Sequence, residues 1–189
     1  MKIKLNPMFE EARGQLGGMV LRELRGETIA SRKPSSIGEP TVDQAAQRER
    51  FKLAAAYGKS ALADPLTRAL YEAAANNKKI PVFALTVADY LNPPTIHEVD
   101  LSGFSGEIGQ AIRIKASDDF GVARVSVTIS DNAGSLVYEG DDAIETAPGS
   151  GVWVYTTTGG VPDGVTAKVS VVAADRPGGV AVQDATKVI

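Results

Sequence analysis

Apolar and polar residues alternate through the segment 122–130, and this feature constrains the fold most. The alternation is clearest in Val125-Ser126-Val127-Thr128-Ile129-Ser130, and it follows the turn-forming run Ser117-Asp118-Asp119-Phe120-Gly121. Successive side chains of a strand point to opposite faces, so a period of two places the apolar residues on one face. The pattern predicts a half-buried antiparallel strand.

The same period recurs from Ile96 to the last residues of the chain. The expected strands are 108–116, 122–130, 136–139, 152–157, 169–173 and 180–188. Turn chemistry separates them, for example at Asn132-Ala133-Gly134 and Pro162-Asp163-Gly164. About seven short strands without a helix between them predict two antiparallel sheets packed as a sandwich.

The first half of the chain is predicted to hold a β-hairpin and three helices. The hairpin covers residues 14–34, where a turn at Arg25-Gly26-Glu27 joins the strands 19–24 and 28–32. A two-stranded hairpin is marginal by itself in water, so we expect it to pack on the helices, on the β module or on another subunit.

Helix start signals occur at three places after the hairpin. Thr41 and Gln44 have the spacing of a capping box and open a helix through about Leu62. Asp64-Pro65 starts a second helix, and Pro81 starts a third that ends at Leu91, before Asn92-Pro93-Pro94. The predicted fold class is therefore α+β with two domains, a hairpin-and-helix domain at 1–94 and an all-β sandwich at 95–189.

Helical spacing also predicts which faces of the helices are buried. The first helix has one stripe formed by Phe51, Ala54, Ala55, Gly58 and Leu62. The second helix is expected to bury the face formed by Leu66, Ala69, Leu70 and Ala73.

Composition excludes several classes of site. The chain has no cysteine and one histidine, His97, which rules out disulfides, thiolate metal sites and histidine-rich zinc sites. The charge is divided, with 14 Lys and Arg against 10 Asp and Glu in residues 1–94, and 6 against 13 in residues 95–189. This asymmetry suggests two units with different surroundings.

The sequence has no apolar run near the length of a membrane helix, and its first residues lack the apolar core of a secretory signal. We therefore expect cytoplasmic synthesis without a standard signal peptide, with the protein part of a particle or exported by a non-standard route. A membrane is not expected among its partners.

The second half resembles the bacterial immunoglobulin-like modules of surface and assembly proteins. The resemblance rests on segments in the right order: Ser117-Asp118-Asp119-Phe120-Gly121-Val122, Gly151-Val152-Trp153-Val154-Tyr155, Pro162-Asp163-Gly164 and Ala174-Asp175-Arg176-Pro177-Gly178. It implies an immunoglobulin-like sandwich at 95–189 that acts as a spacer or binding unit without catalysis. The first half contains a Gly-rich hairpin with Arg22, Arg32 and Pro34, followed by Gln44, Gln47-Arg48, Arg50-Phe51 and Tyr57. In these residues it is similar to the openings of uncharacterised bacterial and phage-associated proteins.

Three aspartates form the candidate metal site. Asp118, Asp119 and Asp175 fall in loops that a sandwich can bring to one end, and carboxylate oxygens are the ligands that Ca²⁺ prefers. The favoured interpretation is that Asp118 and Asp175 close turns by accepting backbone hydrogen bonds. No cofactor is expected apart from calcium at this site.

Two further candidates are surfaces. Trp153 and Tyr155 share one face of their strand and would form a ligand platform if exposed, although burial in the core is favoured. Arg22, Arg25, Arg32 and Lys33 form a candidate interaction surface on the hairpin. Interspersed Glu23 and Glu27 favour an ordinary mixed-charge surface over a nucleic-acid site.

These residues predict a non-catalytic structural or adaptor protein, because no nucleophile and base occur in a recognisable catalytic pattern. We expect a subunit of a larger or self-associating assembly, phage-like or particle-like, in which the first half docks and the sandwich projects. Its partner would be another protein or further copies of the chain. The alternatives are a carbohydrate- or calcium-dependent binding module, and a nucleic-acid-associated protein acting through the basic first half.

Overall fold

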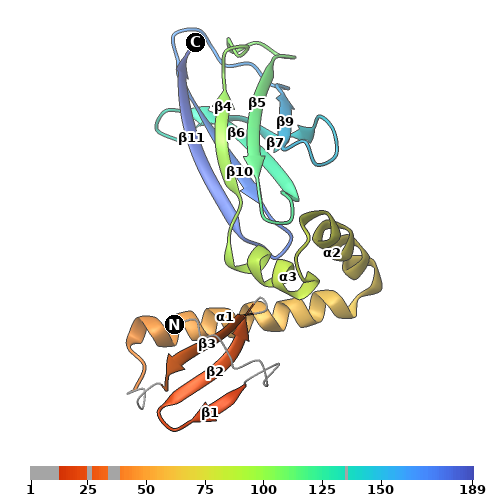
Figure 1. The fold of residues 1–189 in the computed structure, drawn as a ribbon. Helices are drawn as coiled ribbons and strands as arrows, with labels where there is room; N and C mark the ends of the chain where they lie inside the picture. The colour runs from red at the N-terminus through yellow and green to blue at the C-terminus, as the bar shows by residue number, and fades with distance from the viewer. Residues whose placement is uncertain (1–12, 25–26, 34–38, 135) are drawn as a thin grey trace. The chain divides into compact units, whose positions relative to one another are not determined.

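The computed structural model describes residues 13–24, 27–33, 39–134 and 136–189 (Figure 1). These residues form an α+β fold with three helices and three antiparallel sheets. The chain divides into two compact units, Met1–Ala46 and Gln47–Ile189. The boundary predicted between residues 94 and 95 is a different division, and it stays a prediction.

The first unit holds a three-stranded sheet in the order β1-β2-β3. Strand β2 (Met19–Leu24) pairs with β3 (Glu27–Arg32), which confirms the predicted hairpin, while the turn at 25–26 lies outside the described residues. A further strand, β1 (Gly14–Leu16), pairs with β2 through a tight turn in which Gly17 has a φ of +58°. Among the described residues of this unit, Ala30 alone is buried, so the sheet has almost no core of its own.

The three helices begin where their capping residues predict. Helix α1 (Val42–Ala63) opens with the expected capping box, because Gln44 N donates to Thr41 Oγ1 at 3.3 Å and Thr41 N donates to Gln44 Oε1 at 3.2 Å. At α2 (Pro65–Lys78), Asp64 Oδ2 accepts from Thr67 N at 2.8 Å. Helix α3 spans Val82–Leu91.

The predicted buried face of α2 is wrong. Leu66 and Leu70 are 79% and 48% exposed, and Ala69 and Ala73 are exposed with them. The helix instead buries its opposite side through Tyr71 and Ala75, because the Tyr71 hydroxyl reaches hydrogen-bond partners on the other two helices. An apolar stripe at helical spacing is thus left on the surface.

The predicted stripe of α1 is buried only in part. Ala54 and Gly58 are buried as expected, together with Ala61, whereas Phe51 is 54% exposed. None of the described helices is both long and apolar enough to span a membrane.

The remaining strands form two four-stranded antiparallel sheets. One has the order β4-β5-β9-β8, made of Thr95–Asp100, Ala111–Ser117, Val152–Thr156 and Ile144–Glu145. The other has the order β11-β10-β6-β7, made of Val180–Val188, Thr166–Ala174, Arg124–Asp131 and Val137–Asp142. All six predicted strands are present with small shifts at their ends, and β4 and the two-residue β8 are additional.

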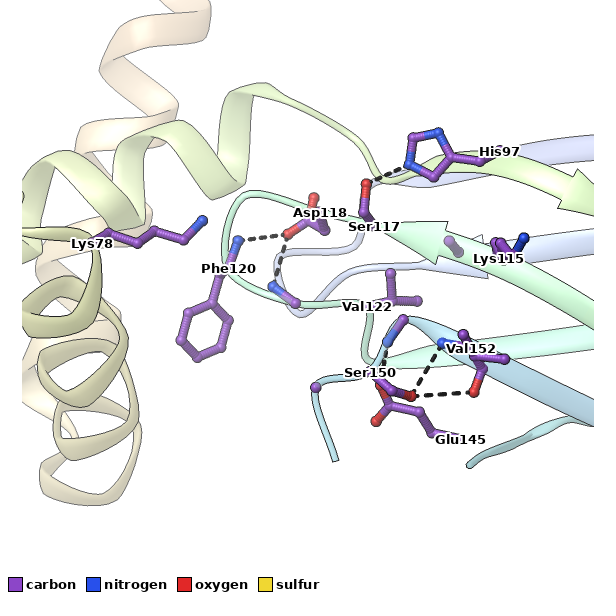
Figure 2. Close-up of a pocket in the computed structure, with 14 residues that line it drawn as sticks. Lys78, His97, Lys115, Ser117, Asp118, Phe120, Val122, Glu145, Ser150 and Val152 are labelled. Atoms are coloured by element: carbon purple, nitrogen blue, oxygen red, sulfur yellow. Dashed lines mark hydrogen bonds between the residues drawn. The ribbon is translucent and has the colours of Figure 1, made fainter. Parts of the chain in front are cut away.

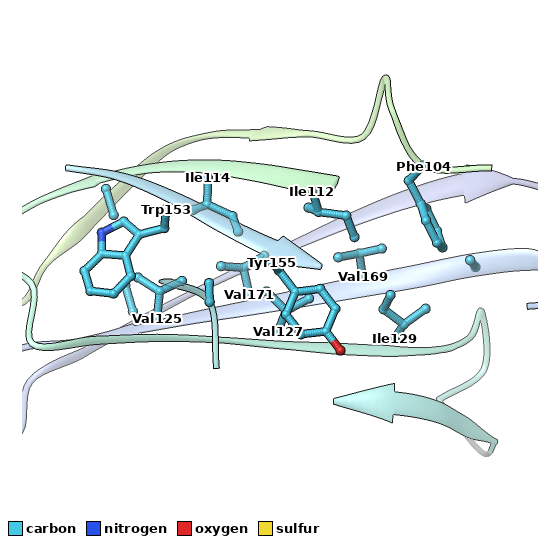
Figure 3. Packing of buried hydrophobic residues seen from close by; sticks show 14 of the residues in the cluster. Phe104, Ile112, Ile114, Val125, Val127, Ile129, Trp153, Tyr155, Val169 and Val171 are labelled. Atoms are coloured by element: carbon cyan, nitrogen blue, oxygen red, sulfur yellow. The ribbon is translucent and has the colours of Figure 1, made fainter. Parts of the chain in front are cut away.

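The two sheets share one hydrophobic core (Figure 3). Val125, Val127 and Ile129 of β6 are fully buried, as the alternation in the sequence predicts. They pack in one cluster with residues of both sheets, including Ile112, Ile114, Trp153, Tyr155, Val169 and Val171. This arrangement is consistent with a β-sandwich.

Candidate functional site

The helices of the second unit contact the loops at one end of the sheets. The loop 118–123 joins β5 to β6, and the loop 175–179 joins β10 to β11. The ring of Phe120 stacks on Tyr71 of α2, with centroids 4.1 Å apart, and the Arg176 guanidinium lies 5.8 Å from the Phe120 centroid. Asn92 Nδ2 donates to Asp119 Oδ2 at 2.6 Å. We call this region the helix–loop junction.

A hydrogen-bonded series of side chains crosses the junction. The hydroxyl groups of Tyr57 on α1 and Tyr71 on α2 lie 2.9 Å apart. Tyr71 in turn donates to Asp89 Oδ2 on α3. Tyr71 and Asp89 are fully buried, and burial raises the pKa of both tyrosines above their ordinary value.

Asp118 and Asp175 close their turns in the structure, as the sequence predicts. Asp118 Oδ2 accepts from the backbone N–H groups of Phe120 and Gly121, at 2.9 and 3.1 Å. Asp175 Oδ1 accepts from Gly178 N at 2.7 Å and Gly179 N at 2.5 Å. One carboxylate oxygen of each residue therefore holds its loop.

The other oxygens of these acids are less well accommodated. Asp89 Oδ1, Asp118 Oδ1 and Asp175 Oδ2 are buried without a hydrogen-bond partner among the residues that the structure describes. Burial raises the pKa of Asp89 to about 7, and the neighbouring carboxyl groups of Asp118 and Asp175 act in the same direction. Burial also raises the pKa of Asp175. The junction thus concentrates acids that resist simultaneous ionisation.

An open pocket of about 510 Å³ lies beside the junction (Figure 2). Its polar lining includes Lys78, His97, Lys115, Ser117, Glu145 and Ser150. The two lysine ammonium groups are already bonded within the chain, Lys78 to the Asp119 carbonyl and Lys115 to Glu98 at 2.5 Å. The Glu98 carboxylate raises the pKa of Lys115.

His97 and Ser117 meet in this pocket, with Nε2 and Oγ 2.6 Å apart. The pairing of β4 with β5 shifts register between Ile96 and Glu98, which makes His97 the extra residue of a β-bulge. The bulge turns the histidine toward Ser117 at the end of β5. The sequence did not indicate this pair, because the bulge breaks the alternation that would have marked β4.

The predicted calcium ligands lie close together in the fold but do not form a metal cluster. Within the described part of the chain, no group of three or more His, Asp or Glu side chains is placed to hold a metal ion. Asp118 and Asp175 bond to the backbone of their own loops, whereas Asp119 bonds to Asn92. Calcium binding stays a prediction that titration must test.

Trp153 and Tyr155 point into the core (Figure 3), with exposed fractions of 8% and 2%. This agrees with the favoured interpretation of their strand, and it removes the exposed platform that a ligand would need. The Trp153 indole Nε1 is buried without a partner among the described residues.

The candidate interaction surface of the hairpin is partly described. Arg22, Arg32 and Lys33 are exposed, and Arg25 lies outside the described residues. Binding of nucleic acid or carbohydrate by this protein stays a prediction.

A second hollow, about 470 Å³ and mostly apolar, lies between α1 and α3. Its lining residues are Phe51, Phe83, Ala84, Val87, Ala88, Leu91 and Asn92. The helices thus expose two apolar features, this hollow and the stripe on α2.

Comparisons with known proteins do not extend this description: no protein-family model, curated protein or solved structure matches the chain.

Proposed function

We propose that this protein is a non-catalytic structural or adaptor subunit of a larger or self-associating assembly, phage-like or particle-like, that docks through its first half. The observation that carries the proposal is the exposed apolar stripe of α2, formed by Leu66, Ala69, Leu70 and Ala73. Apolar residues at this spacing normally face a core. Exposed, they mark a surface for another protein.

The stripe fits a second copy of the same helix. At the helical period, the charged residues Arg68 and Glu72 lie off the stripe and pair with each other at 2.7 Å. An uncharged apolar stripe meets its own copy without like-charge repulsion, and alanines at two of its four positions let two helices approach closely. A two-fold contact of this kind is the commonest in homo-oligomers.

The first unit supports the same proposal. Its three-stranded sheet buries Ala30 alone among the described residues of the unit, while Leu16 and Met19 are exposed. A small sheet without a core gains most of its stability from a partner surface. The exposed Arg22, Arg32 and Lys33 would then lie at or beside a docking interface.

We propose further that residues 95–189 form the immunoglobulin-like module that projects from the docked part. Lettered in chain order as A, B, C, C′, D, E, F and G, strands β4 to β11 give one sheet A-B-E-D and another G-F-C-C′. This order supports the proposal, because immunoglobulin-type sandwiches pair strands A, B, E and D in one sheet and C, F and G in the other. The conserved disulfide of antibody domains has no counterpart here, because the chain lacks cysteine.

Light scattering tests the assembly directly. The purified chain is expected to show a mass that is a multiple of 19.8 kDa, and the double variant Leu66→Gln/Leu70→Gln to revert to the monomer. Val180→Gln/Val182→Gln is the matched control, since these β11 residues are 57% and 62% exposed, and it should leave the mass unchanged. A stable monomer at high concentration, with nothing recovered by pulldown from native lysate, would sink the proposal.

A further inference from the structure

The hydrogen bonds at the helix–loop junction have a direction. A tyrosine hydroxyl has one hydrogen, and Tyr71 gives its hydrogen to Asp89 Oδ2. The contact between the two tyrosines must then be a bond donated by Tyr57 to the Tyr71 oxygen. Donation runs from α1 through α2 to α3 and ends on a buried carboxyl group.

If Asp89 and Asp118 are both ionised, no hydrogen is available to bond one carboxyl group to the other. Asp89 Oδ2 is occupied by Tyr71, and Asp118 Oδ2 is occupied by two backbone N–H groups. The oxygens left over are Asp89 Oδ1 and Asp118 Oδ1, both buried and both without a partner among the described residues. The Asp118 carboxyl group lies close enough to the Asp89 carboxyl group to interact with it directly. Two ionised carboxylates would repel each other here, whereas one proton between them makes a hydrogen bond.

We propose that Asp89 carries a proton and donates it to Asp118, so that a single shared proton locks α3 onto the loop 118–123. Asp118 is the acceptor because its two backbone donors favour its ionised form. Asp89 is the donor because it is fully buried on a helix and has one neutral donor, Tyr71.

Other groups around Asp89 and Asp118 also favour the neutral form of Asp89. Asp175, from the loop 175–179, adds a second negative charge and has its own unpartnered oxygen, Oδ2. Tyr57 and Tyr71 face Asp89 from α1 and α2 as neutral groups whose pKa is raised. Two cations lie nearby, Arg176 over the Phe120 ring and Lys78 on the Asp119 carbonyl oxygen. The surroundings of Asp89 therefore favour its neutral form.

The lock responds to pH in a defined direction. The pKa of Asp89 is raised from 3.8 in the unfolded chain to about 7 in the fold. The folded state keeps this proton after the unfolded state has lost it, so the stabilisation is complete below the unfolded pKa and is lost as pH rises toward the folded value. Above neutral pH, α3 and the loop 118–123 carry facing negative charges and separate more easily.

Carbon-13 NMR of the Asp89 carboxyl group tests the proposal on the unmodified chain. We expect this carbon to titrate near pH 7. A midpoint near that of an ordinary aspartate, around pH 4, would overturn the proposal because Asp89 would then be ionised at neutral pH.

The variant Asp89→Asn gives a second, independent test. Its amide can accept from Tyr71 and donate to Asp118 at every pH, as the protonated acid does. We expect the unfolding temperature of the wild type to fall by about 5–10 °C between roughly pH 5 and pH 8. That of Asp89→Asn should fall much less, by the part that the raised pKa of Asp175 contributes. The control Asp163→Asn, at an exposed turn, should retain the wild-type fall.

Two outcomes contradict the shared proton. Equal destabilisation of Asp89→Asn at all pH values would mean that a charged carboxylate is needed at this position. A rise in the unfolding temperature of the wild type with millimolar Ca²⁺, absent in Asp89→Asn, would mean that a cation rather than a proton joins the acids.

Discussion

At the scale of single residues, Tyr71 holds the helix–loop junction together through one hydroxyl group. It donates to Asp89, accepts from Tyr57 and stacks on Phe120. Tyr71→Phe keeps the stacking but leaves Asp89 Oδ2 without its donor, so we expect a loss of about 1–3 kcal/mol in the free energy of unfolding. The pKa of Asp89 should rise further, because the Tyr71 bond lowers it.

Chemical denaturation and carboxyl NMR check these two effects. Tyr57→Phe is the matched control, since it removes one hydroxyl from the same series but leaves the bond between Tyr71 and Asp89 intact. It should be milder in stability and leave the Asp89 titration in place. Equal losses from both variants would show that the hydroxyl of Tyr71 has no special role.

The residue scale also shows how far sequence reasoning reached at the candidate site. The turn-closing roles of Asp118 and Asp175 could be predicted, because an aspartate bonds to backbone groups only a few positions away. The roles of Tyr71 and Asp89 could not, because their partners come from different elements of the fold. The signal that the sequence offered for Asp89 was a single acidic residue inside the mostly apolar helix Val82–Leu91.

At the scale of elements, the start of β9 depends on a close approach of two backbones. Gly151 has a φ of +67°, and a Cβ added there would lie 2.7 Å from the Ala116 carbonyl oxygen on the neighbouring strand. Ala116 N donates to Gly151 O at 2.9 Å, which holds the strands at this spacing. We expect Gly151→Ala to lower the free energy of unfolding by about 2–4 kcal/mol, from backbone strain and overpacking together.

Gly149→Ala separates the two contributions. Gly149 has a similar φ of +75°, but a Cβ there meets no atom within 4 Å. Its loss should be about 1–2 kcal/mol, from backbone strain alone. If thermal or chemical denaturation gave the same loss for both variants, the contact with Ala116 would not matter.

Local signals explain which elements were predicted correctly. The capping residues Thr41, Gln44 and Asp64 act within their own helix starts, so they located α1 and α2. The prediction of the buried face of α2 was wrong, because a stripe of Leu and Ala does not reveal which side of the helix meets the other helices. Strand β4 was missed because the bulge at His97 breaks its alternation.

At the scale of the whole molecule, we expect the protein to work by presenting surfaces. The second unit has one core between its sheets, a smaller one among its helices and an exposed apolar stripe on α2, whereas the described sheet of the first unit has little core. A chain of this kind gains stability from association. We therefore expect copies of the chain to meet along the stripe of α2.

Cysteine cross-linking tests that claim most directly, because the natural chain has no cysteine. A single Ala69→Cys variant places one thiol in the middle of the stripe, and Thr128→Cys places one on an exposed position of β6 as the control. With a short bis-maleimide and a micromolar concentration of protein, we expect covalent dimers from Ala69→Cys and monomers from Thr128→Cys. Monomers from both variants, or equal dimer yields from both, would contradict it.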